Sequence, residues 1–230
     1  MSALTPLAAV LLDLDGTLLD TAPDMARALN LQRAAHGLAA LPLPTVRPHV
    51  SHGAAAVVRA GFPDVDAATF DRLRTEFLEI YARDLAVETR LFAGFDRVLE
   101  ALDAQRIPWG IITNKSTALT EALLRALALR ERAACVLCGD SLPVRKPDPL
   151  PLLVAARSIG IVPRRCLYLG DALRDAQAAR AAGMVALGAR FGYIGAHDDI
   201  TDWPVDAWID SPLELLAWVG LHPAREAAHT

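Results

Sequence analysis

The sequence predicts an α/β protein whose core is a Rossmann-like, doubly wound parallel sheet with a small helical cap domain inserted after the first strand. Two observations point there: short apolar runs alternate with amphipathic helical segments from residue 94 onward, and a similar apolar run, residues 8–14, opens the chain. Such alternation with right-handed crossovers builds a parallel sheet covered on both faces. A third observation locates the insertion, because residues 21–90 show helical periodicity and no convincing strand. We therefore expect a core domain of residues 1–19 and 91–230 and a cap domain of residues 20–90.

The first helix is expected to begin after Thr21, as N-cap, with Pro23 in its first turn, and to end near His36 before Gly37. Residues 38–50 carry three prolines and are expected to form a loop. Further helices are expected over residues 52–60, 67–88, 95–105, 117–127, 149–159, 173–182 and 213–218. Strands are expected over residues 108–113, 134–138, 166–169, 185–187 and 207–209, with a frayed end at 221–230.

Composition excludes several classes of protein. A chain of 230 residues with 53% hydrophobic residues can bury a sizeable core. Its net charge of −4 gives no reason to expect a nucleic acid or an anionic membrane as partner. The apolar run Leu7–Leu12 stops at Asp13, is too short to span a membrane and lacks a basic leader, so we expect a cytoplasmic protein.

The three cysteines, an odd number, argue against a disulfide framework. Cys135 and Cys138 form a C-x-x-C pair, which in other contexts binds zinc or carries redox chemistry. Here the pair falls in an expected buried strand, where residues three apart point to opposite faces. With no second Cys or His pair nearby, the sequence favours two structural cysteines.

Polar residues follow four of the expected strands, at the edge where ligands bind in parallel sheets. The four groups are Asp13 with Asp15, Thr113 with Asn114, Lys146, and Asp171 with Asp175. Two carboxylates at the end of an apolar strand are costly unless a positive charge lies beside them. A hard cation with oxygen ligands satisfies that requirement, and Gly16 and Thr17 add backbone N–H groups that can hold an anion.

In this order and context, D-x-D-G-T, T-N, K and G-D-x-x-x-D resemble the motifs of the haloacid dehalogenase superfamily of phosphatases. The resemblance covers essentially the whole chain and implies a Mg²⁺ cofactor. It implies that Asp13 is the nucleophile that forms a phosphoaspartate and that Asp15 is the general acid and base. The magnesium ligands would be Asp13, the backbone carbonyl of Asp15, and Asp171.

The same resemblance implies that Thr113, Asn114 and Lys146 bind the phosphoryl oxygens of a small phosphomonoester. Asp175 is expected to act indirectly, by orienting Lys146 or a water on the metal. For Asn114 a structural role, satisfying loop backbone, is an open alternative.

The helical segment of residues 21–90 resembles the small cap domain of the subfamily that includes phosphoglycolate phosphatases. In such a cap Ser51 and His52 are the candidates for contacting the non-phosphate part of the substrate. In the alternative, His49 and His52 merely cap or pack a helix.

The C-terminal third, with residues 191–194, Asp198-Asp199, Trp203 and residues 209–215, resembles a branch that includes N-acetylmuramic acid 6-phosphate phosphatases of peptidoglycan recycling. The implied substrates are N-acetylmuramic acid 6-phosphate and 2-phosphoglycolate. A sugar phosphomutase of the β-phosphoglucomutase type is the alternative function, in which a sugar hydroxyl replaces water as acceptor. Dehalogenases on this fold lack an acid at the position of Asp15, and receiver domains lack a cap. We expect a monomer or a homodimer.

Overall fold

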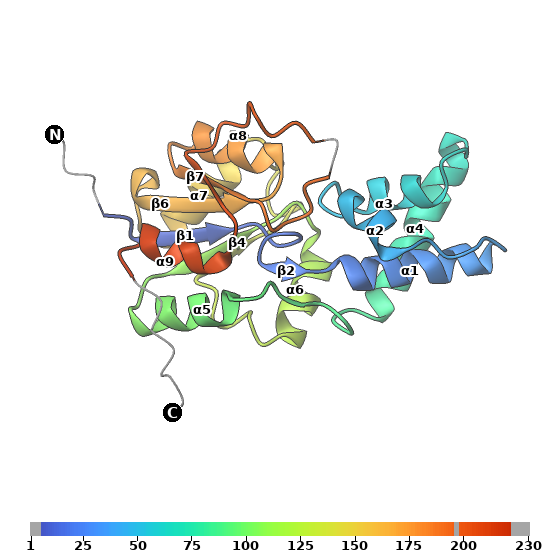
Figure 1. Ribbon diagram of the computed structural model, residues 1–230, viewed down its shortest axis with the longest axis horizontal. Coiled ribbons are helices and arrows are strands. Elements are labelled where there is room, and N and C mark those ends of the chain that lie inside the picture. The colour runs from blue at the N-terminus through green and yellow to red at the C-terminus, as the bar shows by residue number, and fades with distance from the viewer. Residues whose placement is uncertain (1–5, 196–197, 222–230) are drawn as a thin grey trace.

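The computed structural model describes residues 6–195 and 198–221 of the chain. Its larger part is built on a six-stranded parallel sheet in the order β5-β4-β1-β6-β7-β8, which confirms the predicted doubly wound core. Figure 1 shows β1, β4, β6 and β7 of this sheet with helices around them. The strands are β1 (Ala9–Leu12), β4 (Trp109–Ile112), β5 (Cys135–Leu137), β6 (Cys166–Gly170), β7 (Val185–Ala189) and β8 (Ala207–Ile209). The sheet grows outward from β1 on both sides, so the end of β1 lies at the point where the strand order reverses, the usual ligand position.

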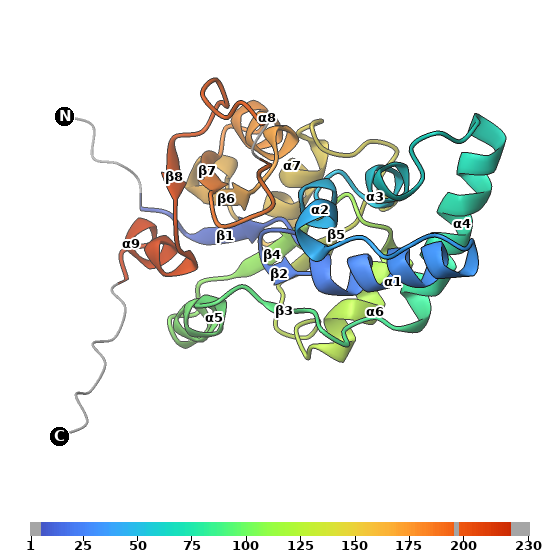
Figure 2. The same ribbon diagram turned by 45° about the vertical axis from the view of Figure 1, so that its right-hand side comes forward.

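Helices cover both faces of the sheet, and the alternation of side chains along β1 shows how. Val10 and Leu12 belong to the apolar core under α5 (Phe95–Ala104), α6 (Thr117–Ala126) and α9 (Leu215–Trp218). Ala9 and Leu11 face the opposite core, under α7 (Leu150–Ser158) and α8 (Leu173–Ala181). Figure 2 shows β8 at one edge of the sheet, and η2 (Pro163–Arg165) and η3 (Pro212–Glu214) are single 3₁₀ turns beside the strands. A sheet buried on both faces needs apolar residues at consecutive positions, which is why β1 reads as an unbroken apolar run.

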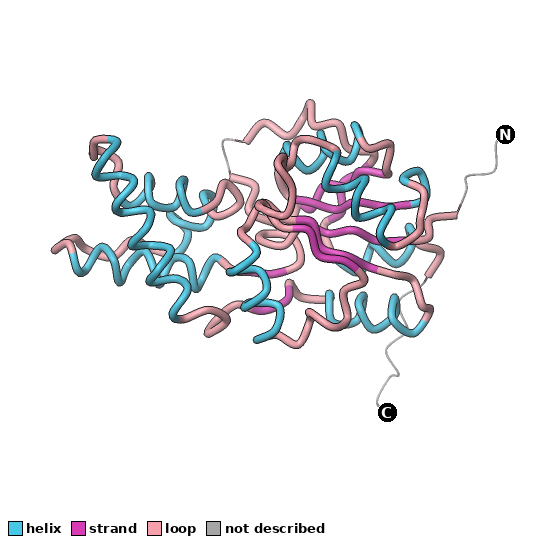
Figure 3. Tube along the Cα trace, turned by 180° about the vertical axis from the view of Figure 1, so that it is seen from behind, coloured by secondary structure: helices cyan, strands magenta, loops and turns pink. Residues whose placement is uncertain are grey.

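The cap is a separate helical layer at one end of the molecule (Figure 3). It contains α1 (Ala22–Ala35), α2 (Leu43–Val46), η1 (Arg47–His49), α3 (Ala54–Gly61) and α4 (Ala67–Arg83). Leu29, Val58 and Phe77, from α1, α3 and α4, lie in its apolar core. The prediction of a loop over residues 38–50 was therefore wrong in part, because α2 and η1 lie there. Both begin with a proline in the first turn, a position where the missing N–H is not needed.

The two connections between cap and core form a small antiparallel sheet that the sequence did not predict. It pairs β2 (Leu19–Asp20) with β3 (Arg90–Leu91). The expected helix over 67–88 ends early, at Arg83. Ala86 has a positive φ of 60°, and the backbone N–H groups of Glu88 and Thr89 donate to the carboxylate of Asp24 on α1. The domain boundaries at residues 20 and 90 stay a prediction.

The remaining expectations concern the cysteines, the termini and the membrane. Cys135, Cys138 and Cys166 are free thiols, and the first two lie in or directly after β5. The predicted fraying of residues 221–230 falls, except for Leu221, outside the described residues. Within the described ranges, no helix has both the length and the apolar character that crossing a membrane requires. A cytoplasmic location and a monomeric or dimeric state stay predictions.

Candidate active site

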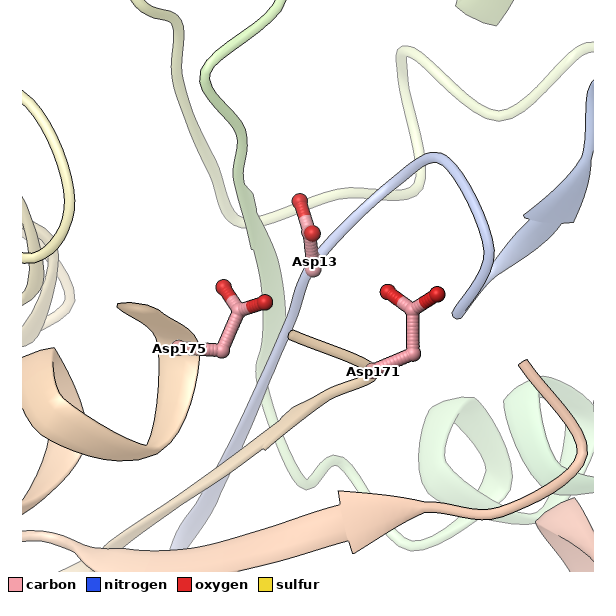
Figure 4. A group of neighbouring side chains, drawn as sticks. All are labelled: Asp13, Asp171 and Asp175. Carbon is pink, nitrogen blue, oxygen red and sulfur yellow. The ribbon is translucent and has the colours of Figure 1, made fainter. Parts of the chain in front are cut away.

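Three buried carboxylates meet at the carboxyl ends of the central strands (Figure 4). Asp13 follows β1, Asp171 follows β6, and Asp175 lies in the first turn of α8. One oxygen from each lies within 4.8 Å of the others. Gly16 is required beside this group: it has a φ of 85°, and a Cβ there would lie 2.1 Å from Oδ2 of Asp171. The strand ends thus converge on one acidic point, as the motif positions predicted.

The electrostatics of this group favour a bound cation. Burial, followed by repulsion from Asp175, raises the pKa of Asp13 to about 7. Burial and Asp175 likewise raise the pKa of Asp171 to about 6. Buried carboxylates that repel one another are a donor set suited to a hard divalent ion such as Mg²⁺. Of the predicted ligands the structure brings the side chains of Asp13 and Asp171 together, with Asp175 as third; the carboxylate of Asp15 lies outside this group.

Lys146 places a positive charge directly beside two of these carboxylates. Its Nζ lies 2.8 Å from Oδ1 of Asp13 and 2.7 Å from Oδ1 of Asp175. It also donates to the carbonyl of Ile112 and the hydroxyl of Tyr168, at 2.7 Å each. The predicted contact between Asp175 and Lys146 is present. Lys146 thus pairs directly with two of the three carboxylates.

Asp15 has a partner that the sequence analysis missed. Lys115 Nζ lies 3.0 and 3.2 Å from the two carboxylate oxygens of Asp15, and Thr21 Oγ1 donates to one of them at 2.6 Å. Thr21 occupies the predicted N-cap position of α1, but its hydroxyl is used here instead. Burial alone would lower the pKa of Lys115, but the neighbouring charge of Asp15 outweighs burial. The net pKa of Lys115 is raised, so the lysine is charged. The available signal was its place directly after Thr113-Asn114, at a strand end.

The cap reaches this second pair through Tyr81 of α4. Lys115 Nζ lies 4.8 Å from the centre of the Tyr81 ring, within cation–π range. Tyr81 is only 1% exposed, so this contact is buried. The environment of Asp15 is therefore built by both domains.

The two polar residues after β4 hold loops in place. Oγ1 of Thr113, a buried residue, accepts a hydrogen bond from the backbone N–H of Lys115 at 3.1 Å. Asn114 Nδ2 donates to the carbonyl of Lys146 at 3.0 Å, which supports the structural alternative for this side chain. Contacts of either residue with phosphate stay a prediction.

The cap loop before α3 contacts the acidic group directly. Ser51 Oγ donates to Oδ2 of Asp171 at 2.5 Å, and the Ser51 carbonyl accepts a hydrogen bond from Arg174. Sequence reasoning gave Arg174 no role, although it lies inside the G-D-x-x-x-D motif. His52 lies beside it on the surface, where partial burial and then the Arg174 charge lower its pKa. Ser51 thus touches a predicted metal ligand, which the expectation of a substrate contact had not included.

Tyr193, in the segment after β7, ties the acidic group to the base of the cap. Its backbone N–H donates to Oδ2 of Asp171 at 2.8 Å. Its hydroxyl donates to Asp20 at 2.7 Å and accepts from the N–H of Ala22 at 2.9 Å. Arg47 of the cap pairs with Asp20 at 3.0 Å and lies 4.8 Å from the Tyr193 ring centre. No local motif predicts this contact between segments far apart in sequence.

Comparisons with known proteins agree with this geometry. Residues 7–183 match the family model of haloacid dehalogenase-like hydrolases. The chain is 43% identical to a phosphoglycolate phosphatase of Xylella fastidiosa over 203 residues, 88% of this chain and 89% of that protein. It is 41% identical to an N-acetylmuramic acid 6-phosphate phosphatase of Pseudomonas putida over 210 residues, 91% and 94% of the two chains.

A solved structure described as a predicted phosphoglycolate phosphatase of Haemophilus somnus superposes with a TM-score of 0.82 at 26% identity, covering 94% of this chain and 99% of that one. The family resemblance read from the four strand-end motifs is thus confirmed by sequence and by fold. A family match over most of the chain, together with relatives that are phosphatases, shows that this protein belongs to the haloacid dehalogenase-like hydrolases.

Proposed function

We propose that the protein is a magnesium-dependent phosphomonoesterase that hydrolyses a small phosphorylated metabolite through a phosphoaspartate on Asp13. The observation that carries the proposal is the position of the Asp13 carboxylate. It is buried at the end of the central strand, 2.8 Å from Lys146 Nζ and beside Asp171 and Asp175. The names of the relatives supply two candidate substrates, 2-phosphoglycolate and N-acetylmuramic acid 6-phosphate. Hydrolysis of the second would belong to peptidoglycan recycling.

The chemistry follows from Asp13 and Asp15. An Asp13 oxygen attacks phosphorus, and the bond from phosphorus to the ester oxygen breaks as the acyl phosphate forms. Asp15 gives a proton to the departing alkoxide and then takes one from the water that hydrolyses the acyl phosphate. Lys146 faces the phosphoryl group and offsets the charge that develops on its oxygens. Thr113 is the other candidate for that contact.

Asp13, Asp171 and the backbone carbonyl of Asp15 would hold the magnesium ion. The buried, mutually repelling carboxylates fit such an ion, as their raised pKa values indicate. When bound, magnesium supplies positive charge to the phosphoryl oxygens. Asp175 holds Lys146 toward Asp13 rather than acting on the substrate.

The test is phosphate release, measured with and without magnesium. Wild-type protein is expected to release inorganic phosphate from p-nitrophenyl phosphate and from the candidate substrates, and excess chelator is expected to abolish release. With p-nitrophenyl phosphate, whose leaving group departs without a proton, Asp15→Asn is expected to accumulate a phosphoenzyme because the amide cannot activate water. The phosphoenzyme would be seen as a mass increase of the intact protein. Full activity in excess chelator would remove the metal from the proposal. Turnover that depends on added sugar bisphosphate, with no phosphate released, would instead favour the phosphomutase.

A further inference from the structure

A hollow of about 450 Å³ opens beside the acidic group, between the cap loop, α8 and the segment that follows β7. It is lined by His52 of the cap, by Arg174 and Gln177 of α8, and by Asp198, Asp199 and Trp203 of the C-terminal segment. These residues come from three parts of the chain that are far apart in sequence. None of them takes part in the phosphoryl chemistry proposed above.

Arg174 connects this hollow to the reacting group. Its guanidinium donates to the carbonyl of Ser51, and the hydroxyl of Ser51 donates to Asp171. An ester whose phosphoryl group sits at Asp13 can therefore extend its alcohol portion past Arg174 into the hollow.

We propose that this hollow binds the alcohol part of the substrate and that this part is a polyhydroxylated ring of sugar size. The inference rests on the proposed phosphomonoesterase function and narrows its substrate class. A volume of about 450 Å³ lies in the range of roughly 300–1,000 Å³ found for small-molecule sites. The glycolyl group of 2-phosphoglycolate takes the space of about three waters, roughly 90 Å³. That group would leave most of the hollow filled with solvent.

The chemistry of the lining favours the same class. Ionised Asp198 and Asp199 only accept hydrogen bonds, so they suit sugar hydroxyls and repel a nearby carboxylate such as that of glycolate. Arg174 and Gln177 add hydrogen-bond donors to the same lining. Trp203 offers an apolar face for the C–H groups of a ring, and its position is supported by Trp208, 5.5 Å away between ring centres.

The decisive measurement is kcat/KM for wild type and Trp203→Ala on four esters. These are p-nitrophenyl phosphate, 2-phosphoglycolate and two amino sugar phosphates, N-acetylglucosamine 6-phosphate and N-acetylmuramic acid 6-phosphate, of which only the second has a carboxylate. Wild type is expected to prefer a sugar phosphate over 2-phosphoglycolate by about 10-fold or more, and Trp203→Ala to lower that ratio by about 10-fold. Trp218→Ala, an exposed tryptophan on α9, is the matched control and is expected to leave every value unchanged.

Asp198→Asn gives an independent reading of charge. The amide keeps an oxygen for the Gly195 N–H that Asp198 binds at 2.7 Å, so the loop retains its contact. The substitution is expected to raise kcat/KM for 2-phosphoglycolate about threefold, since one repelling charge is removed. N-acetylmuramic acid 6-phosphate also carries a carboxylate, so Asp198→Asn is expected to raise its kcat/KM more than that of N-acetylglucosamine 6-phosphate. An equal effect on both would contradict the role given to the charge of Asp198.

The outcomes separate the two levels of the proposal. Hydrolysis of p-nitrophenyl phosphate with a preference for 2-phosphoglycolate, or a Trp203→Ala effect equal on all four esters, overturns the sugar-sized hollow and leaves the phosphomonoesterase standing. No magnesium-dependent phosphate release from any ester overturns both.

Discussion

Two lysines pair with aspartates in this site, and the surroundings of the two lysines differ. Lys146 binds Asp13 and Asp175 with residues of the core alone, and its side chain is 1% exposed. Lys115 binds Asp15, whose side chain is 16% exposed, and the face of Lys115 is covered by Tyr81 of the cap. The first pair is complete within one domain. The second depends on where the cap lies, as a group that serves the leaving alcohol should.

The comparison assigns different steps to the two pairs. In the proposed mechanism Asp13 and Lys146 act on the phosphoryl group, so loss of Lys146 should slow every substrate alike. In the same proposal Asp15 carries out the proton transfers, so the effect of losing Lys115 should depend on how much the leaving group needs a proton. Three substitutions test this division.

The largest effect is expected from Asp13→Asn. An amide cannot form the acyl phosphate, so kcat should fall by at least about 10³-fold for every ester. Asp96→Asn, an exposed aspartate in the first turn of α5, is the control and should retain full activity. Retention of more than a few per cent of kcat by Asp13→Asn would take Asp13 out of the nucleophile role.

The substitutions Lys146→Met and Lys115→Met compare the two lysine–aspartate pairs directly. Lys146→Met should lower kcat/KM by about 10²–10³-fold for good and poor leaving groups alike. Lys115→Met frees the carboxylate of Asp15 from its counter-ion and should lower kcat/KM by about 10²-fold for an alkyl phosphate. For p-nitrophenyl phosphate, whose leaving group departs without a proton, the loss should be smaller.

Rates of both variants should be read beside their thermal unfolding, because each change leaves a carboxylate without its cation. Equal losses on both esters for Lys115→Met, in a protein that remains folded, would contradict the division and make Lys115 a structural residue.

The smallest effect concerns the junction of cap and core. Asp24, on α1, accepts hydrogen bonds from the N–H groups of Glu88 and Thr89 and from the Thr89 hydroxyl. Burial would raise its pKa, but these bonds outweigh burial and lower it. Asp24→Asn should therefore reduce the free energy of unfolding at pH 7 by about 2 kcal/mol.

The sign of the pH dependence follows from that lowered pKa. A carboxylate with a depressed folded pKa stabilises the protein above its unfolded pKa of about 3.9, and the contribution fades as pH falls through the folded value. In denaturant titrations the gap between wild type and Asp24→Asn should be full at pH 7 and shrink below about pH 4. A gap that is constant with pH would mean that the charge of Asp24 plays no part.

The same contrast explains what could be predicted from sequence. Asp13, Lys146 and Asp171 each follow an apolar strand, and parallel strands bring their carboxyl ends to one edge, so local pattern sufficed to place them together. The contacts of Lys115 with Tyr81 and of Arg174 with Ser51 join core and cap. These contacts depend on how the cap packs against the core, and the hydrophobic periodicity of a single segment does not predict that packing.

The errors in the fold have similar causes. Residues 43–49 were expected to be loop because of their prolines, although a proline in a first turn is compatible with a helix. Helix α4 ends at Arg83, five residues early, because Asp24 binds the following backbone from another helix. A local signal was overinterpreted in the first case, and a distant contact was decisive in the second.

Tyr193 has a mechanical consequence. The two covalent connections of the cap run through β2 and β3, and Tyr193 adds a third, noncovalent tether from Asp171 to Asp20 and the start of α1. This tether lies at the base of the cap, in addition to the contacts that Ser51 and Tyr81 make with the core. Because one tether ends on Asp171, any movement of the cap would pull on the acidic group itself. Residue 193 also lies beyond the span matched by the family model, so this tether comes from the part of the chain outside that match.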